Sequence, residues 1–180
     1  NRYQHHTVSI LEIGFGTGLN ALLSLLYSAE HHISIHYHTI EPEPICVDLI
    51  TRINYPKQLQ TSPALFKQLH DCSWQTNHHL SPHFYFSKYH SIQEIDHHKR
   101  FDIIFYDPFC PNTAPQLWTE TAFSQMYSLL TQTGILVTYS SKGSVKRALK
   151  AVGFQLERLS GPPGKRHIIR ANKDLNDLPR

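Results

Sequence analysis

Short apolar segments with the composition of buried strands alternate along this chain with segments of helical spacing. The strand-like segments are rich in branched and aromatic residues and lie at 8–14, 33–41, 83–89, 101–107 and 134–140. The helix-like segments lie at 20–30, 44–54, 117–130 and 144–153, with a shorter one at 91–98. Alternation of this kind predicts an α/β fold with a mostly parallel sheet and helices on both of its faces.

The end of the chain departs from this alternation. Two more strand-like segments, 154–160 and 167–173, are joined by only six residues, and so short a connection forces an antiparallel pair. We therefore predict a seven-stranded sheet that ends in an antiparallel β-hairpin. Residues 56–82 have no clear period beyond one helix around 63–72. No linker, repeat or low-complexity tract is visible, which predicts a single domain over residues 1–180.

Three glycines, Gly14, Gly16 and Gly18, lie between the first strand and the first helix, where ligands of such sheets bind. Their spacing differs from the G-x-G-x-x-G of dinucleotide sites, and the nearby Glu12 would repel a pyrophosphate. The same carboxylate would suit a cationic ligand. Glu41 ends the second strand, where an acid accepts the hydroxyls of a ribose. Together these residues predict a site for a cationic nucleoside without phosphate, which describes S-adenosylmethionine.

The strand-like segment 101–107 ends on Asp107, which opens a loop stiffened by three prolines. Asp107 is either a cap of the strand end or a functional carboxylate at the ligand edge of the sheet. Cys110 follows in the same loop. We interpret Cys110 as a small structural residue rather than a nucleophile, because no sequence feature marks an activating base for it.

Four stretches of the sequence resemble one protein family. They are LEIGFGTGLN at 11–20, YDPFCPNTAPQLWT at 106–119, GILVTYSSKGSVKRALKAVGF at 134–154 and GPPGKRH at 161–167. They are similar to the methyltransferase domain of the bifunctional tRNA 5-methylaminomethyl-2-thiouridine biosynthesis proteins and of their stand-alone relatives. The likeness covers roughly residues 8–172. The first stretch is shared by many class I methyltransferases, whereas the loop after Asp107 and the GPPGKR turn are more specific.

The resemblance implies a Rossmann-like class I fold that binds S-adenosylmethionine, with no metal and no flavin in this chain. It implies methylation of the primary amine of a 5-aminomethyl group on a wobble uridine of tRNA, with or without a 2-thio group. Asp107 would orient that amine and help to remove a proton, and Phe109 would pack against the target base or the methionine moiety. Trp118 is expected to anchor the loop to the core rather than to stack on a base. The implied cofactor residues are Glu12, Gly14, Gly16, Gly18, Asn20 and Glu41.

Two family features are not visible in this chain. An N-terminal segment with a Tyr-His-Ser and Gly-Ala signature usually precedes the glycine loop, so we expect that N-terminal residues are missing before Asn1. Many members carry a Gly-Asp-Ala whose Asp contacts the adenine, and here Lys88 and Tyr89 lie near that place. The oxidase domain of the bifunctional proteins is absent from these residues, which makes a separate flavin-dependent oxidase an expected partner.

Positive charge gathers in the last third of the chain, although the net charge is only +3. Nine of the seventeen Lys and Arg lie from Lys142 to Lys173, opposed only by Glu157. A polyanionic partner would explain this, and so would a solvated helix face beside an exposed hairpin. The resemblance favours the anticodon stem-loop of tRNA as the partner. The residues expected to contact its phosphates are Lys142, Arg147, Lys165 and Arg166.

Other features of the sequence bear on membrane association, cellular compartment and metal binding. No apolar run approaches the about 20 residues that span a bilayer, and no secretory signal is visible, so no membrane partner is expected. The three cysteines are widely spaced and form no C-x-x-C pair, which fits a reducing cytosol and predicts a cytoplasmic protein. The fourteen histidines show no H-x-x-x-H or H-E-x-x-H spacing on an expected helix, so no metal site is predicted.

Two other functions stay open at this point. The chain could be an amino-group methyltransferase that acts on another nucleic-acid base or on a small amine. It could also be a non-catalytic RNA-binding domain with a vestigial cofactor pocket, since the usual adenine carboxylate and the N-terminal segment are not visible.

Overall fold

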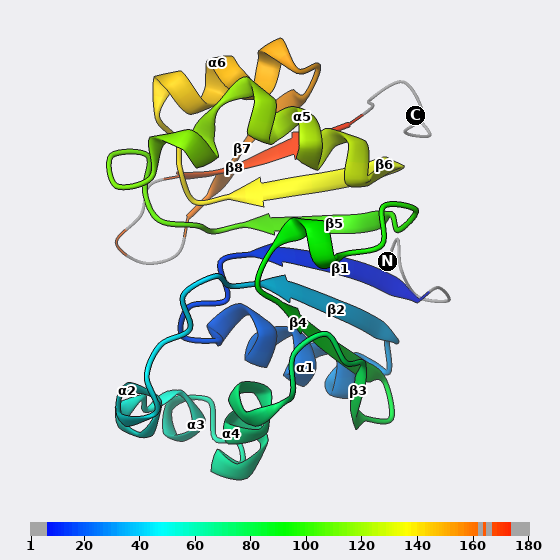
Figure 1. Ribbon diagram of the computed structural model, residues 1–180, viewed down its shortest axis with the longest axis vertical. Coiled ribbons are helices and arrows are strands. Elements are labelled where there is room, and N and C mark those ends of the chain that lie inside the picture. Colours follow the sequence, from blue (N-terminus) through cyan, green and yellow to red (C-terminus); the bar gives the residue numbers. More distant parts are fainter. Residues whose placement is uncertain (1–6, 162–163, 165–166, 174–180) are drawn as a thin grey trace. The chain divides into compact units, whose positions relative to one another are not determined.

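The computed structural model describes residues 7–161, 164 and 167–173, and Figure 1 labels its helices and strands. The chain divides into two compact units, Asn1–Asp96 and His97–Arg180. None of the helices in the described residues has the length and the apolar character needed to cross a membrane.

The described residues of the first unit form four strands in the order β3–β4–β2–β1. They are β1 (Val8–Ile13), β2 (Ile35–Ile40), β3 (His78–Ser81) and β4 (Phe84–Tyr89). The central strand β2 pairs in parallel with β1 and with β4, whereas β3 is antiparallel to β4. Leu11, Tyr37 and Phe86 are fully buried, one from each of the three parallel strands, so the core of this unit lies on its sheet.

The helices of the first unit are α1 (Leu19–His31), α2 (Val47–Arg52), α3 (Tyr55–Gln58) and α4 (Pro63–Asp71), with a 3₁₀ turn, η1 (Ile92–Glu94). Helix α1 packs against β2 and β4 and buries Leu22 and Leu25. Helix α4 begins at Pro63, whose fixed φ suits the first turn of a helix, and it buries Phe66 and Leu69. The expected helix around 63–72 is therefore confirmed.

Three expectations for the first unit need correction. The predicted helix at 44–54 is shorter, because Ile53 is extended and Tyr55–Pro56 begins a new helical turn. The predicted helix at 91–98 is only the 3₁₀ turn η1. Strand β3 lies in the segment without a clear period and brings the described strands to eight rather than seven. Since β3 has four residues, none buried, and an irregular register, no apolar alternation marks it in the sequence.

Four strands are also formed by the described residues of the second unit, in the order β5–β6–β8–β7. They are β5 (Phe101–Tyr106), β6 (Leu130–Thr138), β7 (Gln155–Ser160) and β8 (His167–Asn172). Strands β5 and β6 are parallel, and β8 is antiparallel to both of its neighbours. The α/β class and the terminal antiparallel hairpin are thus confirmed.

The helices of the second unit are α5 (Glu120–Leu129) and α6 (Gly143–Ala151), with a 3₁₀ turn, η2 (Pro115–Trp118). The predicted helix at 117–130 is divided at Thr119, whose hydroxyl accepts a hydrogen bond from the backbone N–H of Ala122 at 3.2 Å. Thr119 is therefore the N-cap of α5, which is a position that threonine favours.

Gly134 lies inside β6, beside an irregularity in the pairing of β6 with β5. A Cβ atom at this position would stand 2.9 Å from the carbonyl oxygen of Phe101 and 2.9 Å from Cδ2 of Leu130. The neighbouring backbone therefore leaves no room for a side chain at residue 134.

We expect Gly134→Ala to lower the free energy of unfolding by about 1–3 kcal/mol, because the methyl group overpacks a buried site. Gly143→Ala is the matched control, since its nearest neighbour is the flexible Arg147 guanidinium at 3.3 Å. The control should change stability by at most about 0.5 kcal/mol in urea denaturation. Equal effects of the two substitutions would contradict the packing described for β6.

Candidate functional site

The predicted glycine loop connects β1 to α1 and contains Gly14, Gly16 and Gly18, all with positive φ. The N–H of Gly14 donates to the carbonyl of Ile40 at 2.9 Å, which ties the loop to the end of β2. At Gly18 a Cβ atom would lie 3.0 Å from the Phe15 ring, whereas at Gly16 it would meet nothing within 4 Å. Gly18 is thus required by packing, and Gly16 faces open space.

Glu41 is 6% exposed and lies directly after β2. Its Oε2 accepts the N–H of Gly16 at 2.8 Å, and its Oε1 accepts the N–H of Glu43 at 3.0 Å. The structure therefore joins two residues that the sequence assigned to one site from positions 25 residues apart. A carboxylate oxygen has more than one lone pair, so both oxygens can still accept a hydroxyl.

Glu12 is fully buried at the end of β1. Its Oε1 accepts from Nδ2 of Asn20 at 3.0 Å, and its Oε2 accepts from the hydroxyl of Thr39 at 2.8 Å. Glu12 and Asn20 are therefore brought together, as predicted for one site. Thr39 was not predicted, but the parallel register places it directly beside Glu12.

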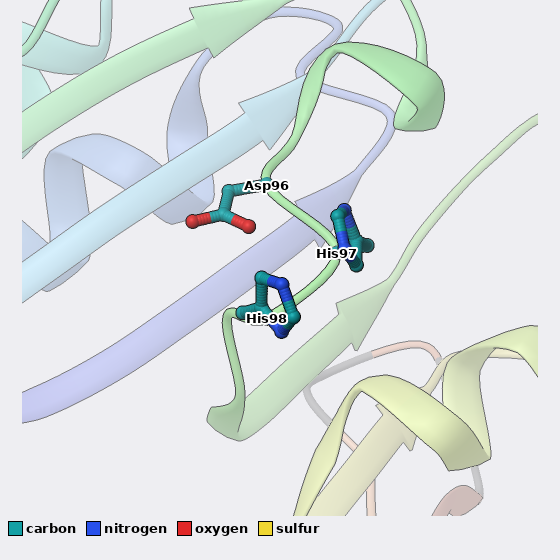
Figure 2. A group of neighbouring side chains, drawn as sticks. All are labelled: Asp96, His97 and His98. Carbon is teal, nitrogen blue, oxygen red and sulfur yellow. The ribbon is translucent and has the colours of Figure 1, made fainter.

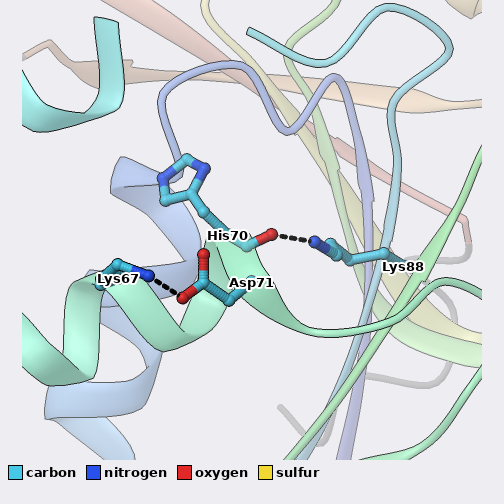
Figure 3. Close-up of polar contacts among 4 residues, drawn as sticks. All are labelled: Lys67, His70, Asp71 and Lys88. Carbon is cyan, nitrogen blue, oxygen red and sulfur yellow. Dashed lines mark hydrogen bonds and ion pairs between the residues drawn. The ribbon is translucent and has the colours of Figure 1, made fainter. Parts of the chain in front are cut away.

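A cavity of about 420 Å³ adjoins the glycine loop on the side of helices α2 to α4. This size is within the range of small-molecule pockets. Its walls are mostly apolar and include four charged or titratable residues, Lys67, His70, Asp71 and Lys88. Figure 3 shows these four side chains. Sequence reasoning missed this cavity, because most of its lining comes from residues 44–74, which the sequence did not resolve into the three short helices α2, α3 and α4.

His70 supports the glycine loop from α4. Its ring lies 5.0 Å from the ring of Phe15 and 4.9 Å from that of Phe66. A Cβ atom on Gly18 would come within 3.1 Å of its Nε2. Burial lowers the pKa of His70, which favours the neutral imidazole beneath the loop.

Lys88, which the resemblance places near the family's adenine contact, is only 3% exposed. Its Nζ donates to the carbonyl oxygen of His70 at 2.5 Å (Figure 3) and lies 4.8 Å from the centre of the Trp74 ring. Burial lowers its pKa. The carbonyl belongs to the last turn of α4, so Lys88 satisfies and electrostatically complements the C-terminus of that helix.

In the second unit, Asp107 is exposed and follows β5 directly. The loop that it opens is held by two aromatic side chains. Trp118 Nε1 donates to the carbonyl of Phe109 at 2.9 Å, and the Tyr139 hydroxyl donates to that of Pro108 at 3.0 Å. Trp118 is buried, so its predicted role as an anchor is confirmed. The ring of Phe109 is 59% exposed and is free to meet a ligand.

Two further groups in this region have shifted pKa values. Burial and, secondarily, the charge of Asp107 raise the pKa of Tyr139 to about 12, so its phenol keeps its proton at neutral pH. A hydrogen bond from the Thr113 hydroxyl lowers the pKa of Cys110, whose thiol is exposed. Cys110 thus fills no buried space, and its Sγ contacts Thr113 Oγ1 at 3.3 Å.

The four predicted tRNA contacts are placed only in part. Lys142 is exposed and its Nζ donates to Asn112 Oδ1 at 2.7 Å, so it links the Asp107 loop to the start of α6. Arg147 is exposed on α6. Lys165 and Arg166 lie outside the described residues.

One group among the described residues could hold a metal ion. The ligand atoms of Asp96, His97 and His98 lie within 4.8 Å of one another, and Figure 2 shows the three side chains on one stretch of loop. All three are exposed, and they are consecutive in the chain. Structural zinc sites use four ligands, and this group supplies three, so the absence of a metal stays a prediction.

Comparison with known families gives one match over most of the chain. Residues 58–174 match the model of a family described as S-adenosyl-L-methionine-dependent methyltransferases.

Similar sequences are the tRNA 5-methylaminomethyl-2-thiouridine biosynthesis bifunctional proteins MnmC of Methylobacillus flagellatus and Actinobacillus pleuropneumoniae. They are 29% and 26% identical to this chain over 98% and 96% of its length. The chain spans only 29% of either relative.

Two solved structures show the same fold. MNMC2 from Aquifex aeolicus has a TM-score of 0.70 at 22% identity and covers 94% of this chain, which spans 55% of that one. CalS10, an amino pentose methyltransferase of Micromonospora echinaspora solved with S-adenosylmethionine bound, has a TM-score of 0.54 at 12% identity. It covers 93% of this chain, which spans 84% of that one.

Substitutions at Gly16 and Gly18 should separate effects on ligand binding from effects on stability. Asparagine tolerates positive φ better than most residues, so Gly16→Asn should leave the melting temperature within a few degrees of the parent. Its side chain would fill the open space, and we expect the affinity for S-adenosylmethionine to fall at least about tenfold, as measured by calorimetry. Gly18→Asn should instead lower the melting temperature, because it collides with Phe15 and His70. A Gly16→Asn variant that binds as tightly as the parent would show that this space is not the cofactor's.

Proposed function

The chain belongs to the S-adenosyl-L-methionine-dependent methyltransferases, and we propose that it methylates the 5-aminomethyl group of a wobble uridine in tRNA. The product would be 5-methylaminomethyluridine or its 2-thio form. The support is the similarity over nearly the whole chain to relatives named for that biosynthesis. Because the chain spans about 29% of those bifunctional relatives, we assign it the methyl transfer alone. A separate flavin-dependent oxidase would then supply the amine.

The observation that carries the proposal is the hydrogen bond from Gly16 to Glu41, with open space on the Gly16 side. A loop closed by this bond can present both oxygens of Glu41 to the two hydroxyls of a ribose. Glu12 places a negative charge beneath the same loop, which favours a sulfonium over a phosphate. The cofactor residues are then Glu12, Gly14, Gly16, Gly18, Asn20 and Glu41.

Methyl transfer needs an amine with a free lone pair. An alkyl amine is mostly protonated near neutral pH, much as lysine is. We assign Asp107 to accept hydrogen bonds from that amine and to take up its proton. The nitrogen lone pair then forms a bond to the methyl carbon, and the carbon–sulfur bond breaks with its electron pair remaining on sulfur. The other product is S-adenosylhomocysteine, and alignment of nitrogen, methyl and sulfur supplies most of the rate enhancement.

The remaining residues would hold the substrate. The exposed ring of Phe109 is suited to pack against an unstacked base, since Trp118 fixes the backbone of Phe109. Lys142 and Arg147, together with Lys165 and Arg166, would contact tRNA phosphates and set the position of the anticodon stem-loop. A tRNA substrate would place the enzyme in the cytoplasm.

Asp107→Asn keeps the shape of the side chain and removes its charge. We expect the single-turnover rate of methyl transfer to tRNA carrying 5-aminomethyluridine to fall by roughly 10²–10⁴-fold at pH 7. The defect should shrink between pH 7 and 9.5, because solvent increasingly removes the proton as the pH approaches the pKa of the amine. S-adenosylmethionine affinity should be nearly unchanged.

Cys110→Ser is the matched control in the same loop, since serine can keep the hydrogen bond with Thr113. It should retain the parent rate. A large loss in the serine variant would instead support covalent catalysis by the thiol, and an Asp107→Asn variant as fast as the parent would leave Asp107 as a strand cap.

A further inference from the structure

Helix α6 has two faces of different chemistry. Val145, Ala148 and Leu149 are buried and pack into the second unit. The other face contains Gly143, Lys146, Arg147 and Lys150, which follow the i, i+3, i+4, i+7 spacing of a single helical stripe. The helix therefore presents three cations side by side, beginning at its N-terminus.

The terminal hairpin adds a fourth cation. Successive side chains of a strand point to opposite faces, so Leu156 and Arg158 share one face of β7 while Glu157 points to the other. Glu157 forms an ion pair with Arg170 of β8. The acid on β7 is thus directed away from Arg158 and is already neutralised.

These residues surround a groove between α6 and the hairpin. Its volume is about 350 Å³, and its lining is Gly143, Lys146, Arg147, Lys150, Leu156, Arg158 and Ile169. Among the described residues that line it there are four cations and no acid. Within the described part of the chain, no hydrogen bond or ion pair engages the side chains of these four cations.

We propose that this groove binds the sugar-phosphate backbone of the tRNA substrate, with Lys146, Lys150 and Arg158 acting beside Arg147. The inference rests on the proposed function for the identity of the RNA. Four neighbouring cations without a counter-charge repel one another, and a polyanion relieves that repulsion while it releases counterions. The amide N–H groups at the start of α6 favour the same negative charge.

The groove selects for phosphate rather than for a base or a peptide. Its described lining has no aromatic or amide side chain that could stack on a base or read its edge. Arginine forks and lysine ammonium groups are the usual partners of phosphate oxygens. The groove would therefore orient the RNA and leave recognition of the target nucleotide to the methyl-transfer site.

The test is the double variant Lys150→Gln with Arg158→Gln, since both side chains are exposed. Its binding to a full-length tRNA transcript is titrated over a range of salt concentrations. We expect the slope of log K against log salt to become shallower by about 1.4–1.8, which corresponds to two lost phosphate contacts. Affinity at low salt should fall at least about tenfold, while S-adenosylmethionine affinity stays the same.

The matched control is Arg52→Gln with Lys57→Gln, which removes two exposed cations from the first unit. The control should keep the slope within about half a phosphate contact of the parent. An equal loss in the control, or an unchanged slope in the groove variant, would overturn the proposal. So would a groove variant that loses affinity for polyglutamate while its affinity for tRNA is unchanged.

Two further measurements distinguish a folding defect from a loss of phosphate contacts, and a failure of the groove from a failure of the proposed function. If the double variant fails to fold, each single variant should still lose about one phosphate contact, and no change in either would overturn the groove. If the parent binds tRNA through the groove but transfers no methyl group to 5-aminomethyluridine, the proposed function fails and the groove stands.

Discussion

A buried carboxylate, that of Glu12, organises the ligand edge of the first unit. Glu12 is removed from water, and a buried charge costs several kcal/mol unless hydrogen bonds compensate for it. Two donors to Glu12, Asn20 and Thr39, come from the first turn of α1 and from β2. Because the buried carboxylate needs both hydrogen bonds, Glu12 fixes the positions of β1, β2 and α1 relative to one another. The glycine loop connects β1 to α1 and therefore lies between two elements whose positions are fixed.

Glu41, which follows the neighbouring strand β2, is also held in place by hydrogen bonds. Its two oxygens accept hydrogen bonds from two backbone N–H groups. The carboxylate therefore has a fixed position at the loop. His70 of α4 and Phe15 of the loop itself fill the space next to Gly18. The loop is therefore supported by packing at Gly18 and by hydrogen bonding at Gly16. A preorganised loop of this kind loses little conformational entropy when a ligand binds.

The sequence predicted those parts that depend on local pattern. Buried strands with branched residues, a glycine loop and an acid at a strand end are each visible in a short stretch of sequence. Glu12, Gly16, Glu41 and Asp107 could therefore be proposed as site residues before the fold was known. Parallel pairing then brings Glu41 to Gly16.

What the sequence could not predict depends on packing between distant segments. The partial burial of His70 and the full burial of Lys88 follow only from how α4 meets the loop and β4. Strand β3 is too short and too exposed to produce an alternating pattern. Helix α2 buries none of its residues, so its ends are set by Ile53 and the following Pro56 rather than by an apolar stripe.

The distribution of charge, rather than its sum, determines what partner the chain can bind. A net charge of +3 is small for 180 residues. Two other cations of the described chain form ion pairs with acids, Lys67 with Asp71 and Arg170 with Glu157. The cations of the α6 groove have no such neighbour in its lining. Since the Debye length at physiological salt is about 8 Å, charges one helical turn apart act together, whereas distant acids are screened. A polyanion approaching α6 therefore meets a locally uncompensated positive field that the overall composition conceals.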